Sequence, residues 1–197
     1  MGLLWPWLPE GCHAAGRRHA TEERSGVYWH MMDEIDRKIL AVLQEDSTVP
    51  MALLAEQVGL SPTPVWKRVQ KLEQAGVITR RVALVQPQQV GIGLIVFVAI
   101  EAQEHSPAWL SRFADAMERM PEIMDAYRMA GEVDYMLRVA VADMAEYDAF
   151  YKRLIAVAPM KNVTSRFAME RLKHTTAYPL HSTAFRDRRA AEPSSEE

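Results

Sequence analysis

The chain has 197 residues, of which 49% are hydrophobic and 25% charged, and its formal net charge is −3 at pH 7. This length allows one or two domains, and the composition is that of an ordinary globular protein. The small negative charge excludes a uniformly basic nucleic-acid-binding protein, so any DNA contact must use a local basic patch. No apolar run approaches the roughly 20 residues of a membrane-spanning helix, so we expect no membrane partner.

Residues 1–31 differ from the rest of the chain, because they show no sustained hydrophobic period and prolines interrupt their apolar stretch. The segment also lacks the basic start of a secretory signal. We therefore expect a disordered or non-native extension, with Met31 or Met32 as the natural start. Its Cys12 is the only cysteine, so the folded part offers no thiol for a disulfide, a zinc site or a nucleophile. The absence of disulfides fits a cytoplasmic protein.

Three short helices are predicted between residues 33 and 76. Apolar residues at helical spacing indicate a first helix opened by Asp33 and a second that begins near Met51 and ends before Gly59. Ser61 is suited to cap the third helix with its hydroxyl, and Gly76 suits its C-terminal end. Two short helices, a glycine-containing turn and a basic third helix are typical of a helix-turn-helix.

The third helix combines an apolar stripe with a basic side. The stripe consists of Val65, Val69 and Leu72. The other side offers Thr63, Lys67, Arg68 and Lys71. Such a face could enter the major groove of DNA. The alternative is an amphipathic helix with a solvated basic face, and the two helices before it favour DNA binding.

A strand and a hinge are predicted after the third helix. Residues 77–85 are rich in β-branched and apolar side chains, which favours a strand. Arg80 and Arg81 on this strand could contact phosphate or could be solvated charges of a wing, and the sequence leaves both open. The proline and glycines of residues 87–93 then indicate a hinge into a second domain.

The second domain alternates strands and helices in a regular order. The expected elements are strands at 94–101, 123–129, 135–141 and 163–172, and two helices that end at Pro121 and Pro159. The order β-α-β-β-α-β is that of the ferredoxin-like split βαβ fold. Its sheet carries helices on one face only. Because the other face also holds apolar residues, we expect it to bury against a second copy.

These motifs, in this order, resemble the Lrp/AsnC family of transcription regulators. The resemblance is carried by residues 33–40, 58–64, 68–78 and 131–135, and it extends from about Met32 to Pro179. It implies an α+β fold, with an N-terminal winged helix-turn-helix and a C-terminal ferredoxin-like βαββαβ sensing domain. The expected parts are the extension 1–31, the DNA-binding domain 32–86, the hinge 87–93, the ligand-sensing and oligomerisation domain 94–179 and a disordered tail 180–197.

Shorter stretches resemble a narrower branch of the family that activates cysteine detoxification. They are residues 63–68, 150–154 and 167–170. The branch often has cysteine where Val65 stands, and Pro50 replaces the polar residue that usually opens the second helix. We therefore expect a sequence-specific transcriptional regulator, possessing no enzymatic activity and no cofactor, that responds to an amino acid such as cysteine or a leucine-like effector.

The resemblance also implies partners and DNA-contacting residues. The partners are double-stranded DNA, a small amino acid and further copies of the chain, as homodimers that assemble into tetramers or octamers associated with the nucleoid. Two recognition helices of a dimer would meet half-sites about one helical turn apart. The expected DNA-contacting residues are Ser61, Thr63, Pro64, Trp66, Lys67, Arg68 and Lys71.

The effector is expected at a turn between two strands of the sensing domain. The matching residues are Gly131, Glu132, Asp134 and Tyr135. Gly131 would let the backbone approach the ligand, and Asp134 would accept from its ammonium group. Backbone N–H groups of the turn would hold its carboxylate. The alternative is an ordinary β-turn with a solvated aspartate.

Other functional classes fit the sequence less well. The histidines are scattered, and His105 and His174 have no metal ligand at the usual spacing. No glycine-rich phosphate loop or nucleophile elbow is present, so we predict no enzyme and no metal site. The alternatives to a specific regulator are an amino-acid-binding oligomeric sensor and a nucleoid-type protein that organises DNA with little sequence specificity.

Overall fold

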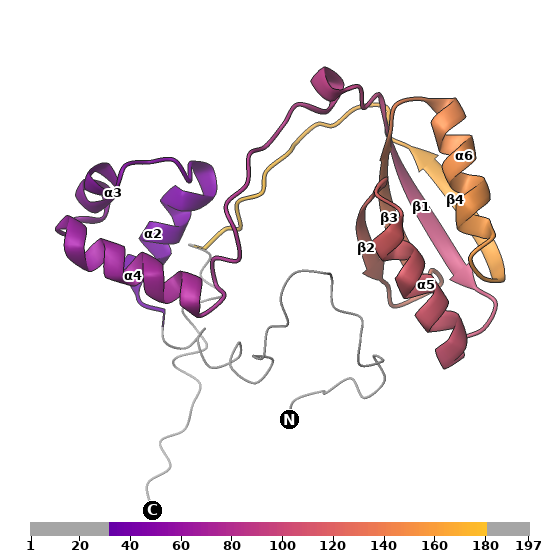
Figure 1. Ribbon diagram of the computed structural model, residues 1–197, viewed down its shortest axis with the longest axis horizontal. Coiled ribbons are helices and arrows are strands. Elements are labelled where there is room, and N and C mark those ends of the chain that lie inside the picture. The colour runs from indigo at the N-terminus through magenta and orange to yellow at the C-terminus, as the bar shows by residue number, and fades with distance from the viewer. Residues whose placement is uncertain (1–31, 181–197) are drawn as a thin grey trace, which may run out of the picture. The chain divides into compact units, whose positions relative to one another are not determined.

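The computed structural model describes residues 32–180 (Figure 1). The predictions for the N-terminal extension, for Cys12 and for the tail beyond residue 180 lie outside this range. The described chain forms two compact units. The first contains the residues up to Ala83 together with those from Lys173 onward, and the second runs from Leu84 to Leu172.

The first unit is a bundle of three helices, α2 (Glu34–Glu45), α3 (Met51–Val58) and α4 (Pro62–Gln74). Each helix turns an apolar face toward one shared core. The buried members of this core are Ile39, Leu40, Leu54, Ala55, Val58, Val65, Val69 and Leu72. This arrangement confirms the three predicted helices, and it leaves the opposite side of α4 facing away from the core.

Local signals set the ends of these helices. Asp33 caps α2, because its Oδ1 accepts a hydrogen bond of 2.8 Å from the amide of Asp36. Gly59 ends α3 with φ +73°, a left-handed conformation that glycine adopts without steric cost. Ser61 precedes α4 as predicted, but its side chain makes no capping hydrogen bond. Pro64 at the third helical position has no N–H, which removes one of the two amides that such a bond could use.

The second unit is a four-stranded antiparallel sheet with the order β2-β3-β1-β4. The elements along the chain are β1 (Leu94–Ala102), α5 (Pro107–Arg119), β2 (Ile123–Arg128), β3 (Tyr135–Val141), α6 (Met144–Ile155) and β4 (Met160–Phe167). This order confirms the predicted ferredoxin-like βαββαβ domain. The second unit also includes the short 3₁₀ helix η2 (Pro87–Val90), which precedes β1.

Both helices of this unit pack on one face of the sheet. Alternate residues of β1 and β3, such as Val98 and Leu137, are buried against Trp109 of α5 and Phe150 of α6. The Trp109 ring stacks on Phe113 with centroids 4.9 Å apart, and its Nε1 donates to the carbonyl of Pro159 at 2.7 Å. These contacts hold α5 against the loop that follows α6.

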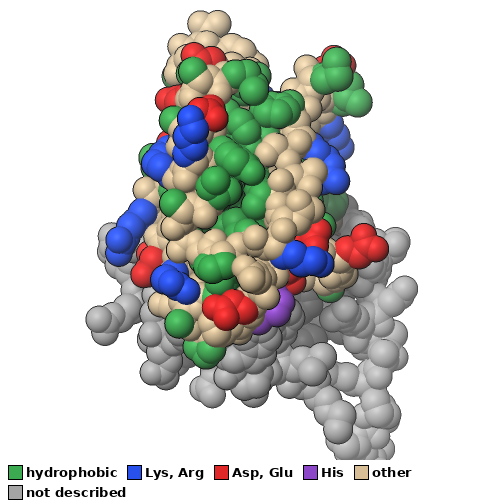
Figure 2. All heavy atoms as spheres, turned by 90° about the vertical axis from the view of Figure 1, so that its right-hand side faces the viewer, with side chains coloured by type: hydrophobic (Ala, Val, Ile, Leu, Met, Phe, Trp, Pro, Cys, Tyr) green, Lys and Arg blue, Asp and Glu red, His purple; other side chains and the backbone are tan. Residues whose placement is uncertain are grey.

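The other face of the sheet mixes apolar and charged side chains. Phe97 of β1 is 41% exposed and lies opposite Arg138, which forms an ion pair with Asp125 of β2. Tyr127, two residues further along β2, is 58% exposed. Phe97 and Tyr127 therefore leave apolar surface accessible on this face of the single chain. Figure 2 looks onto the right-hand side of Figure 1, where a band of hydrophobic side chains lies between lysine and arginine side chains.

Two strand predictions were wrong. Residues 77–85 form no strand, and Val82, Leu84 and Val85 are each more than half exposed. A strand needs a hydrogen-bonding partner, and no described segment pairs with these residues. The last strand is Met160–Phe167 and not 163–172, because its pairing with β1 runs from Ala102 opposite Met160 to Val96 opposite Phe167.

The predicted hinge is partly ordered. Gly91 follows η2 with φ +83°, which turns the chain toward β1. Gly93 has a different role, since a Cβ at this position would collide with the carbonyl oxygen of Ala142. The end of residues 87–93 is therefore packed against the end of β3, where the Gly93 amide also donates to the carbonyl of Val141 at 3.1 Å. No helix within residues 32–180 is long and apolar enough to cross a membrane.

Candidate functional site

The exposed side of α4 is the first candidate site. Val65, Val69 and Leu72 are at most 3% exposed, so this helix is anchored along one whole face. Of the seven predicted DNA-contacting residues, six are exposed: Ser61, Thr63, Pro64, Trp66, Lys67 and Lys71. The structure therefore brings these six together along the outer side and the first turn of one helix.

A single row of side chains crosses this surface. Thr63, Lys67 and Lys71 are spaced four residues apart, so they lie above one another on the helix. Two lysines at this spacing repel each other by roughly 0.2–0.5 kcal/mol in an isolated helix. A phosphate near both ammonium groups would remove that repulsion. Trp66, beside this row, is 48% exposed and adds a large apolar side chain to the same surface.

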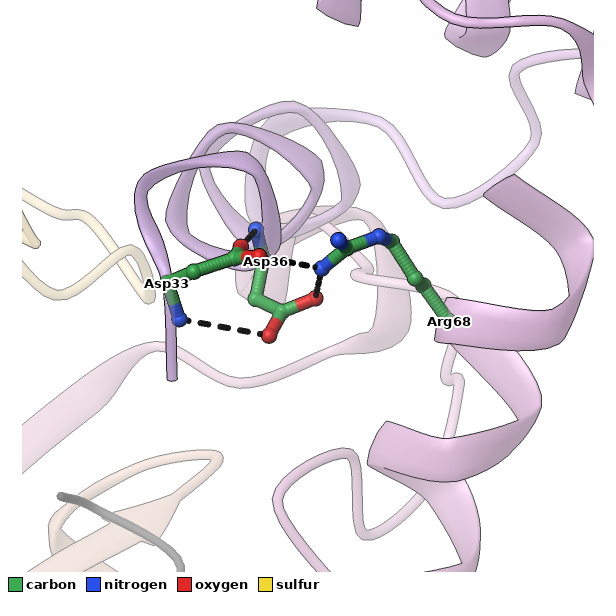
Figure 3. A network of polar contacts seen from close by, with 3 residues as sticks. All are labelled: Asp33, Asp36 and Arg68. Atoms are coloured by element: carbon green, nitrogen blue, oxygen red, sulfur yellow. Dashed lines mark hydrogen bonds and ion pairs between the residues drawn. The ribbon is translucent and has the colours of Figure 1, made fainter. Parts of the chain in front are cut away.

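Arg68 is directed away from this row. Its Nη1 lies 2.7 Å from Oδ2 of Asp33 and 2.7 Å from Oδ1 of Asp36, at the start of α2 (Figure 3). Asp36 is only 8% exposed, which makes it the buried charged residue of the described chain. The guanidinium thus bridges α4 to the cap of α2, and its charge is balanced inside the unit.

The protonation of this cluster follows from its contacts. Burial alone would raise the pKa of Asp33, but the hydrogen bond from the Asp36 amide and the contacts with Arg68 together lower it below its usual value. The hydrogen bond with Asp36 raises the pKa of Arg68. Asp33 and Arg68 are therefore both charged at neutral pH, as an ion pair between them requires.

The turn between β2 and β3 is the second candidate site. Gly131 in this turn has φ +124°, which few other residues adopt. The turn is closed by the amide of Met129, which donates to the carbonyl of Asp134 at 2.8 Å. The Asp134 amide donates to the carbonyl of Ile100 at 3.0 Å, so the turn is joined to the end of β1.

The side chain of Asp134 is held in place by the neighbouring strand. Its Oδ2 accepts a hydrogen bond of 2.8 Å from the amide of Ala102, next to an irregularity in the pairing of β1 with β4. Its Oδ1 lies 3.5 Å from Nε2 of His105. The side chain is 29% exposed. Asp134 is therefore not a freely solvated turn residue, and one of its oxygens remains at the surface beside a histidine.

The other predicted effector residues do not all share this surface. Gly131 and Glu132 are exposed beside Asp134, but Tyr135 is only 8% exposed. The Tyr135 ring packs against Trp109 and Phe113, with centroids 5.7 and 4.5 Å away. Burial raises the pKa of its hydroxyl. The Tyr135 side chain is therefore part of the hydrophobic core and anchors the end of the turn to it.

Several charged residues near Asp134 escaped the sequence analysis. Glu101 accepts from Lys161 at 3.0 Å and from Asn162 at 3.1 Å, and these hydrogen bonds lower its pKa. His105 was examined only as a metal ligand. The register of β1 with β4 places Glu101 opposite Asn162, and the spacing of residues along the sequence does not reveal this register. Within the described residues no group of three metal-ligating side chains occurs.

Each of the two units matches a known protein family model. A family model for a winged helix-turn-helix DNA-binding domain matches residues 32–79, and a model for the Lrp/AsnC ligand binding domain matches residues 95–178. The chain is 50% identical over 151 residues to the DNA-binding transcriptional activator DecR of Escherichia coli K12, covering 76% of this chain and 99% of the relative. It is 44% identical over 160 residues to a glutamate uptake regulatory protein of Zymomonas mobilis, covering 81% and 98%.

Solved structures agree with these matches. An AsnC family transcriptional regulator from Agrobacterium tumefaciens is 55% identical, with a TM-score of 0.73, and the match covers 76% of this chain and 97% of that one. A transcriptional regulator from Neisseria meningitidis, solved as a complex with L-Met, is 32% identical with a TM-score of 0.73 and the same coverage.

Proposed function

We propose that this chain, which belongs to the Lrp/AsnC family of ligand-responsive, DNA-binding transcriptional regulators, reads a specific DNA sequence with α4 and changes its DNA binding when a small amino acid occupies the turn before β3. The chain is a regulator and not an enzyme. The observation that carries the DNA contact is the exposed row of Thr63, Lys67 and Lys71 on a helix whose opposite side is buried.

In this proposal α4 lies in the major groove with its outer side toward the bases. Lys67 and Lys71 contact phosphate or base edges, Thr63 contacts the first base edges, and Trp66 packs against the groove wall. Ser61 and Pro64 border the contact at the start of the helix. Arg68 acts differently from the prediction, because its bridge to Asp33 and Asp36 orients α4 without touching DNA.

Selection of binding sites from a random DNA pool tests the specific function. A specific regulator should enrich one pseudo-palindromic sequence and bind it about 10³-fold or more tightly than scrambled DNA at the same salt concentration. The alternative, a protein that organises DNA with little specificity, predicts a ratio near one. The measurement must be made at several salt concentrations, since phosphate contacts alone give strong binding at low salt.

The effector is proposed to be a small amino acid. Its ammonium group would meet Oδ1 of Asp134, the oxygen not used by the Ala102 amide, and its carboxylate would meet backbone N–H groups around Gly131. Cysteine is the first candidate, because of the resemblance to the branch that activates cysteine detoxification. Leucine and methionine are the competitors, and the Neisseria relative was solved with L-Met.

Calorimetric titration with cysteine, leucine and methionine tests this site. Replacing Asp134 by Asn keeps the shape of the side chain and removes its charge. One charge-assisted hydrogen bond contributes roughly 1.5–3 kcal/mol, so the affinity should fall about tenfold to a hundredfold. Equal affinity in wild type and variant would place the effector elsewhere. Tight binding of leucine but not of cysteine would keep the site and reject the subgroup.

We further propose that the chain forms homodimers that assemble into tetramers or octamers. The support is the sheet face opposite the helices, where Phe97 and Tyr127 are exposed although they are large and apolar. Sedimentation equilibrium of wild type and of a Phe97→Glu variant would test this interface. A wild-type monomer at micromolar concentration would contradict the proposal.

The direction of regulation is proposed to be activation, since half of the aligned residues are identical to those of a transcriptional activator. Transcription in vitro from a promoter carrying the selected sequence would test it. More transcript with the protein and cysteine than without either supports activation, and less transcript identifies a repressor.

A further inference from the structure

Residues 173–180 follow the last strand of the sensing domain, and although the ligand-binding-domain model extends to residue 178, their contacts place them in the DNA-binding unit. The chain leaves the DNA-binding unit after Ala83, forms the second unit from Leu84 to Leu172, and returns to the first unit at Lys173. Within residues 32–180, two chain segments therefore connect the units. A single linker would leave the DNA-binding unit free to turn about one point, and a second attachment restricts that motion.

The returning segment is held on α2 by one side chain. Gln44 offers both halves of its amide to the same residue: its Nε2 donates to the carbonyl of Tyr178 at 3.3 Å, and its Oε1 accepts from the amide of Tyr178 at 2.8 Å. The glutamine amide thus pairs with the backbone N–H and C=O of one residue, as a residue of a neighbouring strand would. Leu180 adds apolar contact with the core of the three-helix unit.

The attachment depends on the backbone of the segment. The Tyr178 side chain is 78% exposed, so it takes no part in the docking. Any residue with an N–H could therefore stand at this position. Proline could not, because it has no N–H to donate to Gln44. This distinction gives a matched pair of variants at one position.

We propose that Gln44 is a positioning residue, which docks residues 173–180 on α2 and so restrains the DNA-binding unit relative to the sensing domain. The inference assumes the dimeric DNA binding of the proposed function. When the segment is undocked, residues 84–93 are the remaining attachment of the unit within the described chain. Half-sites lie roughly 34 Å apart, so this freedom lowers the effective concentration of the second unit at its half-site.

Hydrogen exchange tests the docking directly in the full chain. In wild type the amide of Tyr178 should be protected by its bond to Gln44. Gln44→Ala should accelerate exchange of a peptide covering residues 173–180 about tenfold. Gln103→Ala, at an exposed position in the other unit, is the matched control and should exchange as wild type does. Unchanged exchange in Gln44→Ala would overturn the proposed docking.

DNA binding tests the positioning. The probes are a duplex selected by the wild-type chain from a random pool and the same duplex with one half-site scrambled. Gln44→Ala and Tyr178→Pro should each weaken binding to the intact duplex about threefold to tenfold, with binding to the single half-site unchanged. Tyr178→Ala should match wild type on both probes.

The remaining outcomes separate this inference from the dimeric mode of binding. An equal loss on both duplexes would mean that Gln44 supports the folding of the unit and does not position it, which overturns the inference. A wild-type chain that binds both duplexes equally contradicts dimeric binding itself. In that case the inference also fails as a positioning device, and the exchange measurement still decides whether the segment docks.

Discussion

Replacing Arg68 by alanine would remove the bridge between the recognition helix and the start of α2. The arginine was predicted to contact DNA, and the structure instead directs its Nη1 to Asp33 and Asp36, each at 2.7 Å. The variant would leave the carboxylate of Asp36 nearly buried, with a long hydrogen bond of 3.4 Å from the Asp33 amide as its other partner. We therefore expect a loss of stability.

The size of this loss follows from exposure. Removing one partner of a fully buried ion pair costs roughly 3–5 kcal/mol, and an exposed pair contributes only about 0.2–1 kcal/mol. The Asp36 side chain is 12% exposed and that of Arg68 is 33% exposed, so water reaches one partner but hardly the other. We expect the free energy of unfolding of the DNA-binding unit to fall by about 2 kcal/mol, between these limits.

Native-state hydrogen exchange of α2 and α4 would measure this loss, since slow amides report the free energy of opening of the unit that contains them. Lys38→Ala is the control, because Lys38 forms an exposed pair with Glu34 at 3.2 Å on the same helix. Lys38→Ala should lower the free energy of unfolding by at most about 0.5 kcal/mol. Arg68→Lys should recover part of the loss, since an ammonium group can reach one carboxylate but cannot replace the planar guanidinium.

The effect should also depend on pH. The folded-state pKa of Asp33 is lowered, so its contribution is present above the unfolded value of about 3.9 and is lost as the pH falls through the folded pKa. The difference in stability between wild type and Arg68→Ala should therefore be constant near neutral pH and shrink below about pH 4.

Two results would refute this account of Arg68. The first is a cost no larger than that of Lys38→Ala. The second is an unchanged free energy of unfolding together with a salt dependence of DNA binding that is weaker by about one charge, which would identify a phosphate contact.

The remaining predictions concern the DNA surface and the sensing turn. Lys71→Ala should weaken binding to all DNA sequences and reduce the slope of log affinity against log salt by about one charge, measured by fluorescence anisotropy; an unchanged slope would exclude a phosphate contact. Gly131→Ala and Gly131→Val should cost the sensing domain similar amounts, about 1–3 kcal/mol by thermal unfolding, because the penalty comes from φ +124° and no atom lies within 4 Å of a built Cβ. A much larger cost for valine would show that the turn is crowded by a partner. Asp134→Ala should lower stability even without effector, through the unpaired amide of Ala102, whereas a role limited to the ligand predicts no change.

Local signals made most of the fold predictable. Asp33, Gly59 and Gly76 mark helix ends through their own backbone or side-chain chemistry, and the structure gives Gly76 φ +73° as predicted. The strand Tyr135–Val141 was predicted with its observed bounds, since its alternating apolar residues reflect one buried face. Residues 77–85 are also rich in β-branched and apolar side chains but find no partner strand within the described chain, and composition alone does not reveal whether a partner strand exists.

The candidate site was predictable only in part. A basic residue on an exposed helix looks the same in sequence whether it meets DNA or a carboxylate 32 positions away, as Arg68 and Asp36 do. Tyr135 beside the turn could not be distinguished from a ligand contact until its ring was placed in the core. The pairing of Gln44 with Tyr178 spans 134 positions and has no local signature at all.

The two prolines in the first turn of α4 change how the free recognition helix meets its target. A helix normally begins with four amide groups that are free to bind an anion, but Pro62 and Pro64 each lack one of these donors. The proline rings also fix the backbone dihedral angles of this turn in the free protein. Each such constraint lowers the conformational entropy of the unfolded chain, which stabilises the folded state by roughly 0.4–1 kcal/mol. The start of the helix is therefore preorganised. In the proposed mode of DNA binding, association should proceed without a folding step at this end of the helix, and with fewer amide donors there more of the free energy of phosphate contact should come from the lysine side chains.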